Sequence, residues 1–182
     1  EIKYIKMNLK ESEKSKFHQS WWNLLSTEFG EDYMINLYKS LSTNLYRQNI
    51  VPGKNGLYKQ FRECSYSDIL VCFIVPKPIV SYGQSLVWQY ISMLTELEGD
   101  VGLNFEENMD YLLKYGIIHI PVVMTDSKEI NHNELGWQTF TKKAVDRLSQ
   151  SQNKVLFIYE DSCLEILDKV DLVKHECCLL ES

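Results

Sequence analysis

The hydrophobic residues follow a helical spacing in the first third of the chain and form short continuous runs beyond it. Apolar residues three or four positions apart predict helices, whereas a short apolar run bounded by Gly or Pro is typical of a strand covered on both faces. Helices are therefore expected at Glu11–Phe29, Asp32–Tyr46, Gln84–Leu97, Phe105–Tyr115, Glu134–Ser149 and Ser162–Leu167. Strands are expected at Ile69–Val75, Gly116–Met124 and Val155–Tyr159, with a last one inside Leu172–Leu180.

The order of these elements predicts the fold class. Strands alternate with helices, and no hairpin turn joins two strands, which favours parallel pairing. We therefore expect an α/β fold, namely a three-layer α/β/α sandwich around a central, four-stranded and mainly parallel sheet. Ligands of such folds bind beyond the carboxyl ends of the strands. A site is thus expected in the loops that follow Val75, Pro121, Tyr159 and Leu180.

Length and composition favour one hydrophobic core. The chain has 182 residues, of which 45% are hydrophobic, and a core of this size suits one domain better than two. We expect an N-terminal tail at residues 1–10, in which Met7 is a candidate native start, and a single domain at 11–182. No apolar run approaches the roughly 20 residues of a membrane helix, and the N-terminus lacks the pattern of a signal peptide. A membrane partner is not expected.

Charge and cysteine content restrict the partners further. The formal net charge is −6, from 19 Lys and Arg against 25 Asp and Glu. Tight non-specific DNA binding relies on neutralising phosphates, so this charge disfavours it. The five cysteines are odd in number and lack metal-ligand spacing, which favours a reducing intracellular compartment, such as nucleus or cytoplasm, over a disulfide framework or a metal site. No cofactor is expected.

Three stretches carry a family resemblance. Ser20–Phe29 reads SWWNLLSTEF, Gly116–Thr125 reads GIIHIPVVMT, and Gly136–Thr141 reads GWQTFT. Their order and spacing resemble the uracil-DNA glycosylase family over nearly the whole chain from the first Trp pair onward. The resemblance implies the sandwich fold described above. It also implies an enzyme that flips uracil out of DNA and hydrolyses its N-glycosidic bond.

The motifs that carry catalysis in that family are changed here. The family's first strand ends in Gly-Gln-Asp-Pro-Tyr-His, where the Asp positions water and supports the developing sugar cation. In this chain Lys77 replaces that Asp and Ile79 replaces the Tyr, and a cation opposes an oxocarbenium-like transition state. The family's base-reading Asn corresponds to Pro121, whose side chain has no hydrogen-bonding group. His175 aligns with the family's last catalytic His, although a lone His near a C-terminus is more often solvent-exposed.

Two sets of polar residues are candidates for partner contacts. Contacts with nucleic acid or protein are predicted for Lys77, Ser81, Lys142, Lys143, Arg147 and His175. An acidic partner surface is predicted for Glu96, Glu98, Asp100, Glu106, Glu107 and Asp110, which share a stretch without any basic residue. Carboxylates this close together repel phosphates within a Debye length. A protein partner is therefore expected, with weak binding of nucleic acid.

Three functions stay open at this point. The leading hypothesis is a catalytically inactive glycosylase-like protein that acts as a binding or scaffolding subunit in a complex for DNA repair or replication. The second is a divergent DNA glycosylase of altered base specificity, which would use Lys77 as an amine nucleophile or Asp126 as the acid. The third is an acidic DNA mimic or inhibitor. The simplest interpretation of Lys77 itself is a solvated lysine in a loop.

Overall fold

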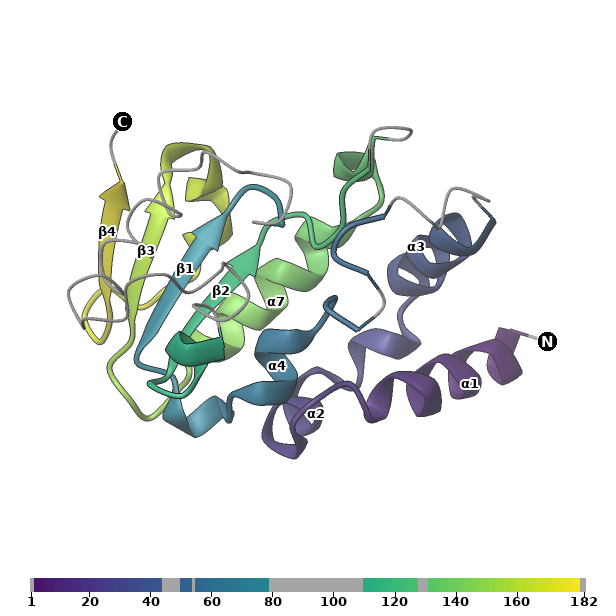
Figure 1. Cartoon of the computed structure of the whole chain (residues 1–182), viewed down its shortest axis with the longest axis horizontal. Helices are drawn as coiled ribbons and strands as arrows, with labels where there is room; N and C mark the ends of the chain where they lie inside the picture. The colour runs from purple at the N-terminus through teal and green to yellow at the C-terminus, as the bar shows by residue number, and fades with distance from the viewer. Residues whose placement is uncertain (1, 44–49, 54, 79–109, 128–130, 181–182) are drawn as a thin grey trace.

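The computed structural model describes residues 2–43, 50–53, 55–78, 110–127 and 131–180 (Figure 1). The α-helices are α1 (Ile2–Lys14), α2 (Gln19–Leu25), α3 (Asp32–Thr43), α4 (Lys59–Glu63) and α7 (Trp137–Ser149). Short 3-10 helices are η1 (Glu28–Gly30), η3 (Tyr66–Asp68), η5 (His132–Glu134) and η6 (Asp161–Leu167). The strands are β1 (Val71–Val75), β2 (Ile117–Pro121), β3 (Leu156–Glu160) and β4 (Glu176–Leu180).

The four strands form one sheet in the order β2-β1-β3-β4. All three pairings are parallel, with Cys72 opposite both Ile118 and Phe157, and Ile158 opposite Cys178. The chain steps outward from β1 to β2, then crosses back to β3 on the other side of β1 (Figure 1). The predicted parallel sheet is confirmed. β1, β2 and β4 fall inside the expected ranges, and β3 extends one residue beyond its range, to Glu160.

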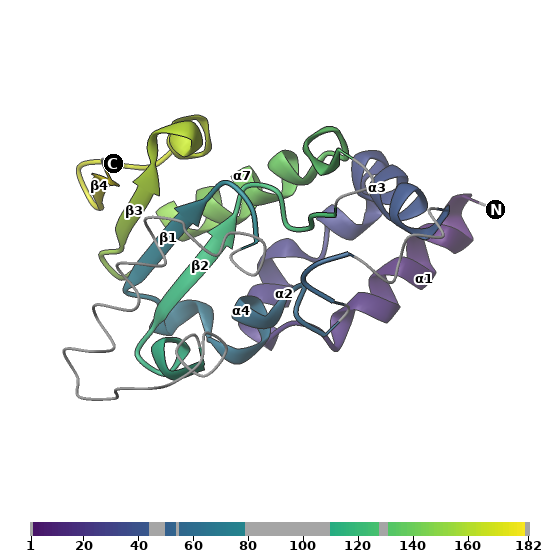
Figure 2. The ribbon, with the colours of Figure 1, turned by 45° about the horizontal axis from the view of Figure 1, so that its top comes forward.

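Alternation along the strands separates the two faces of the sheet. Cys72 and Ile74 belong to the large core shared with α7, which lies behind the sheet in Figures 1 and 2. Phe73 and Val75 point to the opposite face, where Leu112 from the helical turn at 110–113 packs against them. Both faces are thus covered by apolar side chains, as expected for a parallel sheet in an α/β sandwich.

Aromatic rings join the N-terminal helices to α7. Phe140 of α7 lies with its ring centroid 6.0 Å from that of Phe29, 5.9 Å from Tyr58 and 6.0 Å from Phe61. Tilted and edge-to-face ring pairs at such separations each stabilise a core by about 0.5–1.5 kcal/mol beyond the buried area. This aromatic cluster therefore fixes the helical layer against the sheet.

The N-terminal region differs from the sequence prediction in two ways. Residues 2–14 form helix α1, which spans most of the stretch predicted as a tail at 1–10. The single helix predicted at Glu11–Phe29 is divided, because His18 has an extended backbone and its N–H donates to the Phe61 carbonyl at 2.8 Å. The His18 ring then caps α2 by accepting from the Ser20 N–H.

Three helix predictions extend beyond the described residues, and that at Asp32–Tyr46 is described only as far as Thr43. The helix expected at Gln84–Leu97 lies outside them, and of Phe105–Tyr115 only the helical turn at 110–113 lies within them. The last long helix begins at Trp137, three residues later than predicted, because Gly136 is left-handed with φ 96°. Among the described helices, none combines the length and the apolar character needed to cross a membrane.

Candidate functional site

The candidate site lies at the carboxyl edge of the sheet, where the loops after β1 and β2 meet. Pairing of these strands continues past the end of β2, since the Val122 N–H donates to the Val75 carbonyl at 2.7 Å and the Val123 N–H donates to the Pro76 carbonyl at 3.1 Å. Lys77 is the next residue after this ladder. The fold thereby brings Lys77 and Pro121, two of the predicted site residues, to the same edge.

Lys77 forms an ion pair with Asp126. Its Nζ lies 3.1 Å from the Asp126 Oδ1, and the two side chains are 32% and 17% exposed. The Asp126 backbone is itself fixed, because its N–H and carbonyl pair with the Val51 carbonyl and N–H at 2.8 and 2.9 Å. Lys77 is therefore a partly exposed loop lysine that is also held in an ion pair. A carboxylate from the next loop neutralises it.

The ion pair is expected to contribute a modest coupling energy. We expect the double-mutant cycle of Lys77→Ala and Asp126→Ala to give about 0.5–1 kcal/mol, because both groups are partly screened by solvent. Urea denaturation of the wild type, both single variants and the double variant measures it. Additive effects, within about 0.3 kcal/mol, would show that the two charges do not interact in solution.

A buried hydrogen-bond chain holds the loop that carries Asp126. The Trp137 Nε1–H donates to the Thr125 Oγ1 at 2.6 Å, and Thr125 in turn contacts the His132 Nδ1 at 2.7 Å. The other ring nitrogen of His132, Nε2, is hydrogen-bonded to the Ser127 Oγ at 2.9 Å. Asp126 thus lies between Thr125 and Ser127, whose side chains both belong to this buried hydrogen-bond network.

Pro121 ends β2 with an apolar side chain in the buried part of the sheet. Its carbonyl accepts from the Thr141 Oγ1 at 3.0 Å, and the same hydroxyl lies 3.2 Å from the Val122 carbonyl. The backbone polar groups at this position are therefore used within the protein. The side chain can offer neither a donor nor an acceptor to a base.

His175 does not lie at this edge. It immediately precedes β4, at the amino end of the strand, and is only 2% exposed. Its Nδ1 accepts from the Val155 N–H at 3.1 Å, so its Nε2–H donates to the Ser149 carbonyl at 2.8 Å. Both expectations for His175, a solvent-exposed residue and a partner or base contact, are corrected: the ring joins β3, β4 and α7 inside the protein.

Most of the other predicted contact residues lie outside the described part of the chain. Ile79 and Ser81 lie outside the described residues, as do the predicted acidic residues Glu96, Glu98, Asp100, Glu106 and Glu107. Asp110 is described and forms an ion pair with Lys59 of α4. Lys142, Lys143 and Arg147 lie on α7, where the Arg147 Nη1–H donates to the Gln150 side chain at 3.3 Å.

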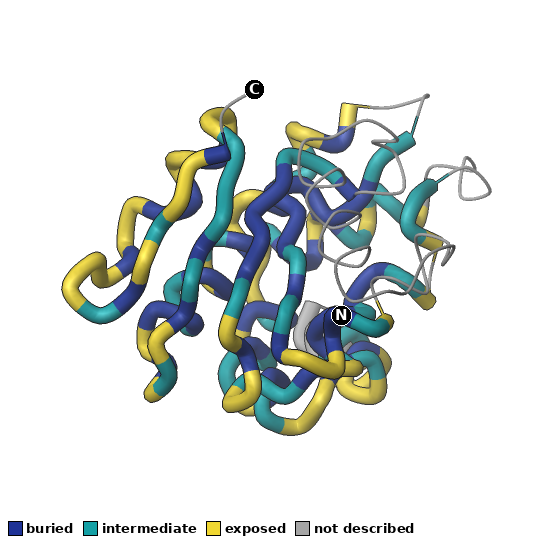
Figure 3. Tube along the Cα trace, turned by 60° about the vertical axis from the view of Figure 1, so that its left-hand side comes forward, coloured by how far each residue is buried: buried dark blue, intermediate teal, exposed yellow. Residues whose placement is uncertain are grey.

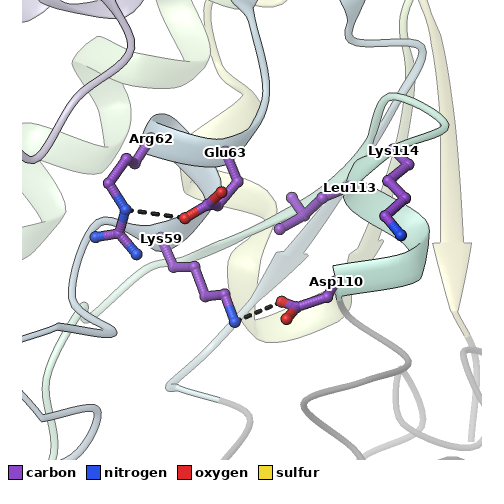
Figure 4. A pocket seen from close by; sticks show the side chains of 6 residues that line it. All are labelled: Lys59, Arg62, Glu63, Asp110, Leu113 and Lys114. Atoms are coloured by element: carbon purple, nitrogen blue, oxygen red, sulfur yellow. Dashed lines mark hydrogen bonds and ion pairs between the residues drawn. The ribbon is translucent and has the colours of Figure 1, made fainter.

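A cavity of about 420 Å³ lies at the opposite, amino edge of the sheet. Its lining residues come from α4 and from the segment that precedes β2: Lys59, Arg62, Glu63, Asp110, Leu113 and Lys114 (Figure 4). Among these lining residues, Lys59 forms an ion pair with Asp110, and Arg62 forms one with the adjacent Glu63. This half-open, mixed-charge cavity is separate from the Lys77–Asp126 edge.

Sequence reasoning missed Glu160, which ends β3 at the carboxyl edge. The β1–β3 pairing ends at Ile74 and Tyr159, one residue before Glu160, and Glu160 pairs with Leu180 of β4. Its Oε1 is buried and has no hydrogen-bond partner among the residues that the structure describes, and burial raises the pKa of this carboxyl. An acidic residue directly after the apolar run at Val155–Tyr159 was the available signal.

Comparison with known proteins finds sequence similarity to uracil-DNA glycosylases. No protein-family model matches it. The uracil-DNA glycosylase of Fusobacterium nucleatum is 26% identical over 178 residues, covering 88% of this chain and 79% of the relative. That of Clostridioides difficile is 26% identical over 173 residues, covering 85% and 77%.

Solved structures share the fold. Mimivirus uracil-DNA glycosylase superposes with a TM-score of 0.69 and 17% identity, covering 97% of this chain and 71% of the other. The enzyme from Nitratifractor salsuginis superposes with a TM-score of 0.58 and 11% identity, covering 96% and 88%. The chain is thus similar in sequence to uracil-DNA glycosylases over most of its length, and it shares their parallel-sheet fold.

Proposed function

We propose that this protein is a catalytically inactive member of the uracil-DNA glycosylase superfamily and serves as a binding or scaffolding subunit of a complex that processes nucleic acid. The Lys77–Asp126 ion pair carries this proposal. The resemblance assigns the position of Lys77 to an unpaired carboxylate that faces the developing sugar cation. An ion pair has no net negative charge to offer that cation, so the largest electrostatic contribution to the reaction is lost.

The buried end of β2 supports the same proposal. Specific recognition of uracil needs donors and acceptors that match its polar edge, and a site built on such bonds rejects bases that lack them. Pro121 provides no such group, and its carbonyl already accepts from Thr141. A base-binding site built on Lys77 and Pro121 would lack both recognition of uracil and the catalytic negative charge.

The two alternatives receive less support. Schiff-base chemistry needs a desolvated, neutral amine, whereas the Lys77 ammonium contacts a carboxylate. Asp126 as the acid would have to act while bound to that ammonium. The acidic mimic relies on residues of which Asp110 alone lies among those described, and Asp110 is paired with Lys59.

A protein partner fits the charge of the chain. A net charge of −6 disfavours phosphate contacts and favours a basic protein surface. A mimivirus relative of the same fold has been solved in complex with UGI, so a protein can bind a member of this fold. We propose the same kind of contact here, in a reducing compartment that suits five free cysteines.

Binding to DNA at two salt concentrations tests the proposal. We expect fluorescence anisotropy with uracil-containing single-stranded and duplex oligonucleotides to show weak binding and a shallow salt dependence, because few phosphates are neutralised. An active uracil-DNA glycosylase, measured in parallel, is the positive control. Tight binding that falls steeply between low and physiological salt would contradict the proposal and restore a DNA-directed function.

A further inference from the structure

The cavity at the amino edge of the sheet carries an excess of positive charge. Its described lining contains three cations, Lys59, Arg62 and Lys114, against two carboxylates, Glu63 and Asp110. The chain as a whole has a net charge of −6. Since a cleft with an excess of one sign of charge concentrates ions of the opposite sign, this cavity attracts small anions that most of the protein repels.

The positive groups of the two ion pairs in the lining are more buried than the negative groups. The side chains of Lys59 and Arg62 are 34% and 33% exposed, whereas those of Asp110 and Glu63 are 49% and 46% exposed. Solvent screens exposed ion pairs and makes them weak. The two carboxylates therefore neutralise the cations only in part. Most of the burial surface in Figure 3 on this side of the sheet is intermediate or exposed, so the cavity is open to solutes.

Arg62 and Lys114 supply hydrogen-bond donors from two separate elements, α4 and the segment before β2 (Figure 4). The Arg62 Nε–H donates to the Glu63 Oε1 at 2.9 Å, and its Nη1–H donates to the Asn55 carbonyl at 3.1 Å. A guanidinium has five N–H donors, so these two bonds orient the group and leave donors for a ligand. The described ion pairs of the cavity do not include Lys114, whose side chain is exposed.

We propose that this cavity binds the phosphate group of a small molecule. Its cations approach from two elements, and a tetrahedral phosphate accepts hydrogen bonds from several directions, whereas a carboxylate has two oxygens in one plane. The volume of about 420 Å³ falls within the roughly 300–1,000 Å³ of small-molecule sites, which leaves space for an organic group beside the phosphate. The site shares no residue with the Lys77–Asp126 edge, so it is independent of the proposed function.

Titration of the ¹⁵N-labelled full chain with inorganic phosphate and with AMP, followed by NMR, tests this site. We expect saturable shifts at the backbone amides of Lys59, Arg62 and Lys114, with a Kd of about 1 mM or lower for AMP. Comparable Kd values for the two probes would identify the free phosphate ion as sufficient. Tighter binding of AMP would identify a phosphate ester as the ligand.

Variants of the lining are expected to change the affinity in opposite directions. Lys114→Ala should weaken AMP binding at least about tenfold, because the cavity loses a charge-assisted hydrogen bond and its excess positive charge. Asp110→Asn should strengthen binding about threefold or more, because it removes a competing carboxylate. The matched control is Lys169→Ala, at an exposed lysine after η6, which should leave the Kd unchanged.

The NMR spectra of the variants also verify that each one is folded. Absence of saturable shifts with both probes up to about 10 mM would overturn the proposal. So would acetate that binds as tightly as phosphate, or a Lys114→Ala protein that binds AMP as tightly as the Lys169→Ala control.

Discussion

Replacing Phe140 with alanine is expected to lower the free energy of unfolding by about 3–5 kcal/mol, a large part of what holds a domain of this size together. Phe140 is fully buried, and its ring contacts those of Phe29, Tyr58, Phe61 and Trp137. Truncation to alanine removes the ring from contacts with the N-terminal helical layer and leaves a cavity that the surrounding rigid rings cannot fill.

Urea unfolding followed by circular dichroism measures this effect. The matched control is Leu164→Ala, because Leu164 is 55% exposed on η6 and its loss is expected to change stability by less than about 0.5 kcal/mol. A Phe140→Ala protein as stable as the control would mean that the aromatic cluster does not connect α7 to the N-terminal helices.

Replacing Gly116 with alanine is expected to cost roughly 3 kcal/mol or more, through backbone geometry rather than a lost contact. Gly116 has φ +73°, a left-handed conformation that costs other residues about 1 kcal/mol or more. An added Cβ would also lie 2.0 Å from the Asp68 carbonyl oxygen. The Asp68 segment cannot move away freely, because the Leu70 and Val71 N–H groups both donate to the Gly116 carbonyl.

Substitutions at two other glycines separate the cost of the left-handed backbone from the cost of the steric clash. Gly136 has φ +96° but an open Cβ position, so Gly136→Ala is expected to cost about 1 kcal/mol for the backbone conformation alone. Gly30 has neither a positive φ nor a neighbour within 4 Å, so Gly30→Ala is expected to be nearly neutral. Thermal unfolding of the three variants should rank them in that order. Equal effects at Gly116 and Gly30 would contradict the close approach of η3 to the start of β2.

The sheet was predictable because most of its strands have a local sequence pattern that is typical of buried strands. A run such as Ile69–Val75, apolar at every position and followed by Pro76, suits a strand covered on both faces and little else. Two further largely apolar stretches, Gly116–Met124 and Val155–Tyr159, separated by helical spacing, leave few arrangements other than a parallel sheet. The helix boundaries were less predictable, since the break at His18 depends on a hydrogen bond to Phe61, forty-three residues away in sequence.

The sequence predicted the position of a site residue only where that residue directly follows or ends a strand. The loops after β1 and β2 were expected at a common edge, and Lys77 and Pro121 do meet there. The partner of Lys77 was not predictable, because Asp126 reaches it from another loop, 49 residues along the chain. His175 was misplaced for a related reason: its position relative to β4 decides which edge of the sheet it joins, and the strand begins one residue after it.

Single-turnover excision of uracil from single-stranded DNA tests the central claim most directly. Wild type, Lys77→Ala and Asp126→Asn would be assayed at enzyme excess, beside an active family glycosylase, with abasic sites revealed by alkaline cleavage. The ion pair at the strand edge predicts that all three proteins release no more uracil than a reaction without protein. Excision by the wild type above that background, abolished in either variant, would contradict it and make the Lys77–Asp126 pair part of a working active site.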